Sequence, residues 1–477
     1  MRKLFFRIWN SPILMTWGSF FSRSLSLVVV LPLLLTRLST DEIALWYLYM
    51  TIISFQMLVD VGFSPTFSRV IAYAMGGAKV DDLKSPKDQN NGQVNWETLE
   101  LICSEMRVIY SRLGLLWPML LVFFGTLAVI KPVSYVQNTF SAWSAWGVIL
   151  VVSTVAIRGN IYSSYLQGIN QIALFRRWEA ITSLAAIVTS FLVLILGGKL
   201  LGLVIAHQGW QLLNILRNRW LSRVVEDGHF KKFSKRRGKK VFDAVWPSAW
   251  RSGVGHFMAY GLIQASGILY AQVGTMASVA SYLLALRLIQ TVSQFSQASF
   301  YSKLPVLARL FAEDKKDELV VLAKRGMRLS YWCYVAGFIG LGILGEPLLK
   351  IIVSNADFPD NLLWSLLGLA FFVERYGAMH LQLYSITNHI VWHIANGIAG
   401  FIYILVCFMT FKIVGVYAFP LALIAGYIGF YSWYSAIHSY RAFKLNFIVF
   451  EKGSMFTPLC VIIIYIIGCY LLNGTLC

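Results

Sequence analysis

Four arginines lie inside long apolar runs, where an ionised side chain costs about 2.5–3.5 kcal/mol on membrane-insertion scales. They are Arg23, Arg158, Arg287 and Arg375. Two carboxylates, Asp60 and Glu374, lie in comparable runs and cannot neutralise all four. A planar guanidinium suits phosphate and pyrophosphate oxygens better than a lysine ammonium does. The pattern predicts a water-filled, cationic cavity that accepts an anionic cargo.

A plainer interpretation gives these charges a packing role only. Arg23 would then pair with Asp60, and Arg375 would pair with Glu374 from another turn or helix. Glu374 and Arg375 are adjacent in sequence, and neighbours one apart on a helix do not face each other. A voltage sensor is excluded, because its arginines recur at every third position of one helix, whereas these lie in four separate runs.

The composition of the chain indicates that these apolar runs lie in a membrane. Of 477 residues, 57% are hydrophobic and only 13% are charged, with a mean hydropathy of +0.64. Soluble domains have about 25% charged residues. A soluble enzyme, a disordered protein and a disulfide scaffold are therefore excluded, and an all-α polytopic membrane protein with 12–13 transmembrane helices is predicted.

About 20 apolar residues cross a bilayer core as a helix. Thirteen such runs are predicted as spans: 13–35, 44–62, 108–130, 143–166, 178–197, 200–221, 250–272, 275–298, 329–352, 362–385, 393–411, 414–438 and 455–472. The first is too long for a signal peptide and lacks a small-residue cleavage site, so we expect an uncleaved span. The second could continue as a helix towards Met75.

The 41 lysines and arginines indicate the orientation. With a cytoplasmic N-terminus, four lie deep within spans, five lie in outer loops or at outer span ends, and the rest lie in inner segments or at inner span ends, as the positive-inside rule requires. The net charge of +19 therefore reflects topology and not nucleic-acid binding. The outer loops hold about a dozen residues at most, which is too few to build an enzyme site there. No G-x-x-x-x-G-K-[ST] motif is present to bind a nucleotide.

The chain divides into two similar halves. A shift of 236 residues aligns 42–48 with 278–284, and 202–206 aligns with 415–419. The predicted organisation is a six-helix lobe at 1–221, a basic cytoplasmic linker at 222–249, a second six-helix lobe at 250–440 and an additional transmembrane helix at 441–477. Two-lobed repeats are common in secondary transporters, which build a site between halves that rock.

Metal ligands are not indicated. The six cysteines show no C-x-x-C spacing. His389 and His393 are four apart, but Ile390 stands where H-E-x-x-H needs its glutamate. We therefore predict neither a metal nor a cofactor.

The chain resembles the O-antigen (Wzx-type) flippases of the multidrug/oligosaccharidyl-lipid/polysaccharide exporter superfamily. The resemblance covers both lobes. It rests on segments 31–38, 42–48, 60–63, 68–69, 166–170, 176–179 and 387–389.

This resemblance implies two six-helix lobes around a central cavity that flips an undecaprenyl-pyrophosphate-linked oligosaccharide from the cytoplasmic to the periplasmic leaflet. Arg23, Arg158, Arg287 and Arg375 would contact this substrate, and Asp60 and Glu374 would couple or gate transport with H⁺ or Na⁺. The implied location is the bacterial inner membrane. The implied partners are membrane lipids, a polysaccharide polymerase and a chain-length regulator.

Two alternatives remain. A multidrug exporter of the same fold would carry cationic cargo and needs an acidic cavity, against which the arginine surplus argues. An O-antigen polymerase would need a large outer loop, and a membrane O-acyltransferase would need a buried histidine with polar partners, for which only His207 or His380 is available.

Overall fold

The computed structural model describes residues 25–26, 29–60, 62–83, 94–232, 239–301, 303–312, 315–387 and 391–471. Within them the secondary structure is helical and contains no strand. Seven helices of this part are long and apolar enough to cross a membrane, judged by length and composition. The prediction of an all-α polytopic chain is confirmed.

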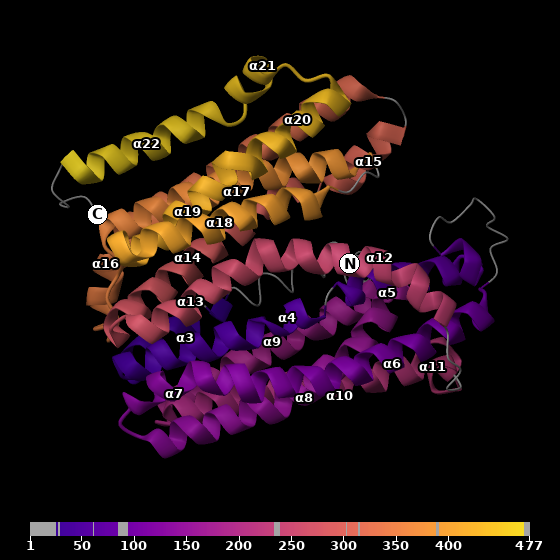
Figure 1. The fold of residues 1–477 in the computed structure, drawn as a ribbon, viewed down its shortest axis with the longest axis horizontal. Helices are drawn as coiled ribbons and strands as arrows, with labels where there is room; N and C mark the ends of the chain where they lie inside the picture. The colour runs from indigo at the N-terminus through magenta and orange to yellow at the C-terminus, as the bar shows by residue number, and fades with distance from the viewer. Residues whose placement is uncertain are drawn as a thin grey trace, which may run out of the picture. The chain divides into compact units, whose positions relative to one another are not determined.

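The chain forms two compact units, Met1–Val254 and Gly255–Cys477 (Figure 1). The N-terminal unit contains α3 (Thr40–Ser54), α4 (Gln56–Val59), α5 (Phe63–Met75), η1 (Val80–Asp82), α6 (Trp96–Leu120), η2 (Leu121–Gly125), α7 (Thr126–Ser134), α8 (Thr139–Gly168), α9 (Ile172–Ile195), α10 (Lys199–Val224), η3 (Glu226–Gly228), α11 (His229–Lys232) and most of α12 (Lys239–His256). The C-terminal unit contains η4 (Phe257–Gly261), α13 (Leu262–Val273), α14 (Met276–Tyr301), α15 (Leu304–Ala312), α16 (Lys316–Ile351), α17 (Asn361–Ser385), α18 (Trp392–Val414), η5 (Gly415–Tyr417), α19 (Ala418–Gly426), η6 (Tyr427–Tyr431), α20 (Ser432–Phe443), α21 (Phe447–Lys452) and α22 (Phe456–Leu471).

Helix α8 is central to the N-terminal unit and packs against α5, α6 and α10. Asn138 begins α8, because its side-chain oxygen accepts a hydrogen bond of 2.9 Å from the Ser141 amide. Such a cap satisfies one of the donors that every helix start leaves unpaired. One end of α8 packs Ile161 and Tyr165 into an apolar core with Phe67 and Tyr110.

The predicted span at 44–62 is not a single helix. α3 ends at Ser54, the short α4 follows, and Gly62 precedes α5 with a φ of 69°. A residue in this left-handed conformation cannot continue a helix. A Cβ at Gly62 would lie 2.6 Å from the Cβ of Ser252 on α12, so the close approach also requires glycine. The chain is then helical to Met75, as expected.

The linker predicted at 222–249 is also partly helical. α10 continues to Val224, and α12 begins at Lys239. Val241, Val245 and Ala249 recur at every fourth position and are buried, which gives α12 an apolar face against the N-terminal unit. Such a face stabilises a helix where the high charge of the segment suggested a loop. Residues 233–238, which hold part of the basic run, lie outside the described residues.

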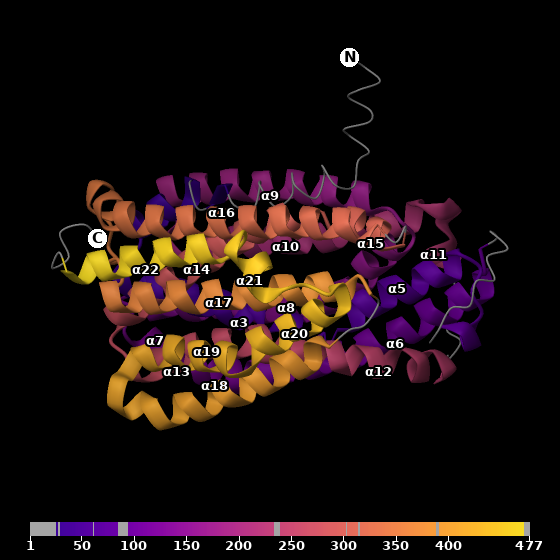
Figure 2. The same ribbon diagram turned by 90° about the horizontal axis from the view of Figure 1, so that it is seen from above.

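Helix α17 is central to the C-terminal unit and packs against α14, α16, α19 and α20. Asp360 begins it by accepting a hydrogen bond of 2.9 Å from the Leu363 amide. The last apolar helix, α22, lies alongside α16 and α17 (Figure 2). Because α17 touches so many neighbours, its polar residues can be bonded from several helices at once.

Candidate functional site

Arg375 lies in the middle of α17, at least ten residues from either end. Only 3% of the residue is exposed. Its Nη1 donates a hydrogen bond of 3.1 Å to Oε1 of Gln297, and its Nη2 donates to Oγ of Ser293. Ser293 and Gln297 are four residues apart and therefore share one face of α14. We call Arg375, Glu374, Ser293 and Gln297 the Arg375 cluster.

Glu374 contributes the one negative charge of this cluster. Its Oε2 lies 3.3 Å from Nη2 of Arg375, and its side chain is 20% exposed. The expectation that these neighbours do not face each other is wrong. Their side chains are long enough to bend towards each other, and the polar positions Ser293 and Gln297 draw the guanidinium to one side. Nε of Arg375 is buried without an acceptor among the described residues.

Asp60 is the polar centre of the N-terminal unit and is 5% exposed. Its Oδ1 accepts hydrogen bonds from the Tyr110 hydroxyl at 2.6 Å and from Nδ2 of Asn160 at 3.2 Å. Its Oδ2 accepts one from the Ser64 amide at 2.8 Å. A carboxylate is an acceptor only, so three donors from α5, α6 and α8 satisfy it and fasten these helices together.

Arg158 lies against α6 from the middle of α8. Its Nη2 donates a hydrogen bond of 3.4 Å to the Gly114 carbonyl, and its side chain covers Gly114 so closely that a Cβ there would lie 2.4 Å from Nε. The residue is nevertheless exposed. An exposed guanidinium at mid-helix depth belongs in water and not in hydrocarbon.

Arg287 is the corresponding exposed arginine of α14, eleven residues after its start. It is not a member of the Arg375 cluster, although Ser293 follows six residues later on the same helix. Of the predicted site residues, Glu374 and Arg375 contact each other. Arg158 lies on α8 and Arg287 on α14. Arg23 lies outside the described residues, and so does its suggested pairing with Asp60.

Arg217 lies near the inner end of the predicted span 200–221 and was not among the expected site residues. Its Nη1 donates to Oδ1 of Asn214 at 2.7 Å and to Oγ1 of Thr182 at 3.2 Å, and its Nη2 donates to Oδ1 of Asn218 at 2.6 Å. The spacing Asn214, Arg217, Asn218 places all three on one helical face, and this pattern could have revealed the cluster.

His380 is one of the two histidines that the acyltransferase alternative could use. It is fully buried, five residues after Arg375 on α17. Nδ1 lies 2.6 Å from Oγ of Ser439, and Nε2 lies 3.1 Å from Oε1 of Glu451. Ser439 and Glu451 are also fully buried. His380 is thus a buried histidine with polar partners, as the acyltransferase alternative requires, but the Ser439 hydroxyl beside it is not exposed.

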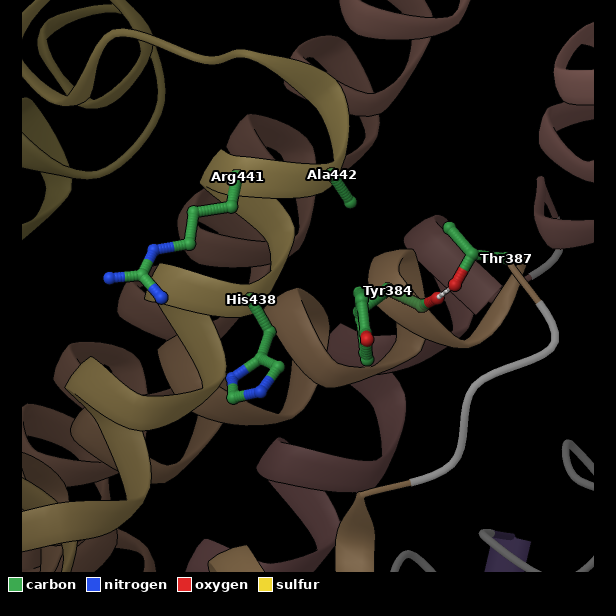
Figure 3. A pocket seen from close by; sticks show the side chains of 5 residues that line it. All are labelled: Tyr384, Thr387, His438, Arg441 and Ala442. Atoms are coloured by element: carbon green, nitrogen blue, oxygen red, sulfur yellow. Dashed lines mark hydrogen bonds between the residues drawn. The ribbon is translucent and has the colours of Figure 1, made fainter.

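A pocket of about 390 Å³ opens where α17 ends beside α20. It is lined by Tyr384, Thr387, His438, Arg441 and Ala442 (Figure 3). The His438 ring packs edge-on against Tyr384, with ring centroids 5.1 Å apart, and its Nδ1 lies 2.9 Å from the Tyr434 carbonyl oxygen. Arg441 is exposed, so the pocket offers cationic donors to an anionic group.

No group of three or more His, Cys, Asp or Glu side chains in the described part of the chain could hold a metal ion. The hydrogen-bonding groups at the centres of the two units are therefore those of arginine, carboxylate, amide, hydroxyl and imidazole side chains. Such groups can bind cations or anionic headgroups.

The sequence matches no family model and no curated relative. Its fold is similar to an inward-facing multidrug resistance MATE family transporter of the MOP superfamily, with a TM-score of 0.62, 11% identity and coverage of 92% of this chain and 96% of that one. It is similar to the lipid II flippase MurJ (0.62, 16%, 97% and 93%) and to the multidrug transporter DinF-BH (0.62, 15%, 92% and 97%). At these identities, the likeness establishes the fold.

Proposed function

We propose that this chain is a flippase of the O-antigen type. It moves an oligosaccharide linked to undecaprenyl pyrophosphate from the cytoplasmic to the periplasmic leaflet of the bacterial inner membrane. It breaks no bond in the cargo and is therefore a transporter and not an enzyme. The observation that carries the proposal is the exposure of Arg158 and Arg287 in the middle of membrane-length helices, together with the burial of Arg375 within α17.

In this proposal the arginines bind the pyrophosphate group of the cargo. Arg158 and Arg287 are exposed and contact phosphate oxygens first, because each presents a fork of donors that matches two oxygens. Nη1 of Arg375 is bonded to Gln297 and Nη2 to Ser293, so the guanidinium is held in a fixed orientation for a phosphate. Arg23 is the fourth contact in this proposal. A similar fold belongs to a protein whose name is lipid II flippase.

Glu374 is the coupling carboxylate of the C-terminal unit. A phosphate and Glu374 compete for the same guanidinium, since Glu374 lies 3.3 Å from Nη2 of Arg375. Binding of H⁺ or Na⁺ to Glu374 frees Arg375 for the phosphate, and release of the cation returns Arg375 to Glu374 and expels the headgroup. The two bindings therefore favour each other by linkage.

Asp60 is the gating carboxylate of the N-terminal unit. It bonds to Ser64, Tyr110 and Asn160 on three helices. Protonation of Asp60 removes the negative charge that strengthens these hydrogen bonds and turns one acceptor oxygen into a donor, and the helices can then shift relative to one another.

A multidrug exporter of the same fold is the second candidate, because MATE transporters have similar folds and Glu374 is a partly exposed carboxylate. A cationic drug would pair with Glu374, but Arg375 in contact with it repels such a cargo. This candidate predicts that expression of the chain lowers accumulation of a cationic dye and leaves surface polysaccharide unchanged.

The experiment uses cells that lack the gene. Surface polysaccharide is separated on a gel, and undecaprenyl-linked saccharides are extracted. The flippase proposal expects loss of surface polymer with complete, unpolymerised repeat units trapped on the cytoplasmic side. Single repeat units that reach the surface would mean that flipping survives and would favour a polymerase.

Complementation then tests the arginines. Arg158→Gln, Arg287→Gln and Arg375→Gln should each lower polymer export about tenfold or more, since a lost charge-assisted bond corresponds to about 1.5–3 kcal/mol. Arg328→Gln, at an exposed arginine of α16, is the matched control and should export normally. If all three variants insert and export at the control rate, the cationic headgroup site is wrong.

A further inference from the structure

Glu451 is the only carboxylate of the short helix α21, which connects α20 to the last apolar helix, α22. It is fully buried. Its Oε1 accepts a hydrogen bond of 2.6 Å from the Tyr440 hydroxyl, and its Oε2 lies 2.8 Å from the Ser454 hydroxyl, which is also 3.0 Å from the Phe450 carbonyl oxygen. Nε2 of His380 lies 3.1 Å from Oε1. This bonding joins α21 to both α17 and α20.

The donors and acceptors around His380 show which protons the ring carries. Nε2 faces a carboxylate, which can only accept, so Nε2 carries a hydrogen. Nδ1 faces Oγ of Ser439 at 2.6 Å, and that hydroxyl also lies 3.0 Å from the Ala436 carbonyl oxygen. A serine has one hydrogen and cannot donate to both. Both contacts are satisfied together when Nδ1 donates to Ser439 and Ser439 donates to Ala436.

A ring that donates from both nitrogens is an imidazolium. The charge of Glu451 leads to the same conclusion, because a buried carboxylate needs a counter-charge as well as hydrogen bonds. His380 is the basic side chain that pairs with it. Burial disfavours the charge of Glu451, but the bonds from His380, Tyr440 and Ser454 outweigh it and hold the pKa of this carboxyl below its ordinary value. The hydrogen bonds around Ser439 and the need of Glu451 for a counter-charge assign the proton to the ring.

The other titratable and charged groups that surround His380 and Glu451 do not supply a positive charge to Glu451. On α17, the Tyr376 hydroxyl lies 2.8 Å from the Tyr440 hydroxyl and extends the chain of hydrogen bonds. On α16, Tyr331 is within electrostatic range of Glu451. The Lys324 ammonium, also on α16, donates a hydrogen bond of 2.8 Å to the Val449 carbonyl at the surface of α21. The tyrosines are neutral, and Lys324 is engaged with the backbone.

We propose that His380 and Glu451 form a proton-binding site of the C-terminal unit and that the bound proton fastens α21 to α17 and α20. Loss of the proton from His380 to water leaves Glu451 as an uncompensated buried charge and removes one of the two contacts of Ser439. The α21 segment then opens. This inference does not depend on the cargo, because it concerns a proton and a helix and not the headgroup site.

The test is hydrogen–deuterium exchange of the full-length protein in detergent, read by mass spectrometry on peptides that cover 444–455. Exchange is measured from about pH 5 to about pH 9, which brackets histidine titration, and is corrected for the intrinsic exchange rate. Protection of the α21 amides should fall about tenfold or more as the pH rises, because a bond to a charged group is lost.

Two variants identify the site. His380→Asn can still donate to Glu451 but cannot titrate, so its protection should be independent of pH. Glu451→Gln should also give a flat profile, because a neutral amide no longer retains the imidazolium. His438→Asn is the matched control: this histidine lies on α20 in the same unit, bonds to the Tyr434 carbonyl and should leave the wild-type pH dependence intact.

The proposal is overturned if wild-type protection of α21 does not change with pH, and this result needs no variant to fold. It is also overturned if His380→Asn keeps the wild-type pH dependence, or if His438→Asn abolishes it. Because the measurement involves no cargo, a failure here leaves the flippase proposal standing, and a failure of flipping leaves the proton site standing.

Discussion

Arg375 is held by side chains that come from two helices. Its partners Ser293 and Gln297 are 82 and 78 residues away in sequence, and Glu374 is its neighbour. Burial of a charge requires several satisfied hydrogen bonds. A guanidinium supplies them because its five donors point in fixed directions, whereas an ammonium carries three donors on a single atom.

Replacement of Arg375 therefore separates charge from geometry. Arg375→Lys keeps the charge but cannot reach Gln297, Ser293 and Glu374 together, so we expect stable protein with export about tenfold lower. Arg375→Ala leaves Glu374 without its partner and should cost about 3 kcal/mol of stability. Polymer export and the thermal unfolding midpoint measure these effects. The control Arg325→Lys, at an exposed arginine of α16, should change neither quantity. Equal export by the two lysine variants would contradict the claim that the guanidinium geometry of Arg375 is required.

Glu451 predicts how acid affects the C-terminal unit. Hydrogen bonds from His380, Tyr440 and Ser454 overcome the effect of burial and lower the pKa of this carboxyl in the folded protein. The stabilisation is therefore fully present above the ordinary glutamate value of about 4.3 and is lost as the pH falls through the lower, folded value. Pepsin, which is active in acid, should cut 444–455 only at pH values well below about 4.3.

Ser454→Ala removes one of these donors, so the pKa of Glu451 rises towards its ordinary value. Pepsin cleavage of 444–455 should then begin at a higher pH than in the wild type. An unchanged onset would show that the carboxylate does not hold α21 in place.

The sequence predicted the positions of charged residues along their helices better than it predicted their contacts. Arg158, Arg287 and Arg375 were expected far from helix ends because charge inside an apolar run is visible in the sequence, and they lie there. The bond between Glu374 and Arg375 was not foreseen, because helical spacing describes backbone directions and not the reach of long side chains. The burial of Glu451 was not predicted because this residue lies between two predicted spans, where a carboxylate is expected to be solvated.

At the scale of the helices, hydropathy predicted most elements because the bilayer fixes their length. The predictions failed where local backbone geometry decides. Gly62 interrupts the second apolar run through its left-handed conformation, and α12 extends into the basic linker because every fourth residue is apolar. Neither feature changes the mean hydropathy of a window, so a search for apolar runs could not detect them.

The contact between α16 and α17 depends on a glycine. A Cβ at Gly368 would lie 2.1 Å from a ring carbon of Phe338, and the Gly368 carbonyl accepts a hydrogen bond of 2.8 Å from Tyr334. Gly368→Ala should therefore destabilise the protein by about 1–3 kcal/mol through overpacking. The thermal unfolding midpoint in detergent reports this loss.

Gly397→Ala on α18 is the matched control, because nothing lies within 4 Å of its added Cβ. Alanine is the better helix former by about 0.5–1 kcal/mol, so this variant should be as stable as the wild type or slightly more so. Equal midpoints for the two alanine variants would contradict the close packing of α16 on α17.

At the scale of the whole molecule, the fold is that of known transporters and flippases, while the cargo is our proposal. The fold could be predicted because the apolar runs determine the number and order of the helices. The cargo could not be predicted with equal force, because a sugar is recognised by hydrogen bonds from scattered residues and leaves no motif. In our proposal the arginines restrict the cargo to an anion, and the membrane setting favours one with a lipid tail.

The most direct test is transport by the purified protein in liposomes. Undecaprenyl-pyrophosphate-linked oligosaccharide is placed in one leaflet, and a membrane-impermeant glycosidase measures its arrival in the other. The account predicts that translocation requires the protein, falls about tenfold or more with Arg287→Gln, and is lost when a neutral linker replaces the pyrophosphate. Translocation of the neutral lipid at the same rate as the charged one would contradict the central claim that arginines select an anionic headgroup.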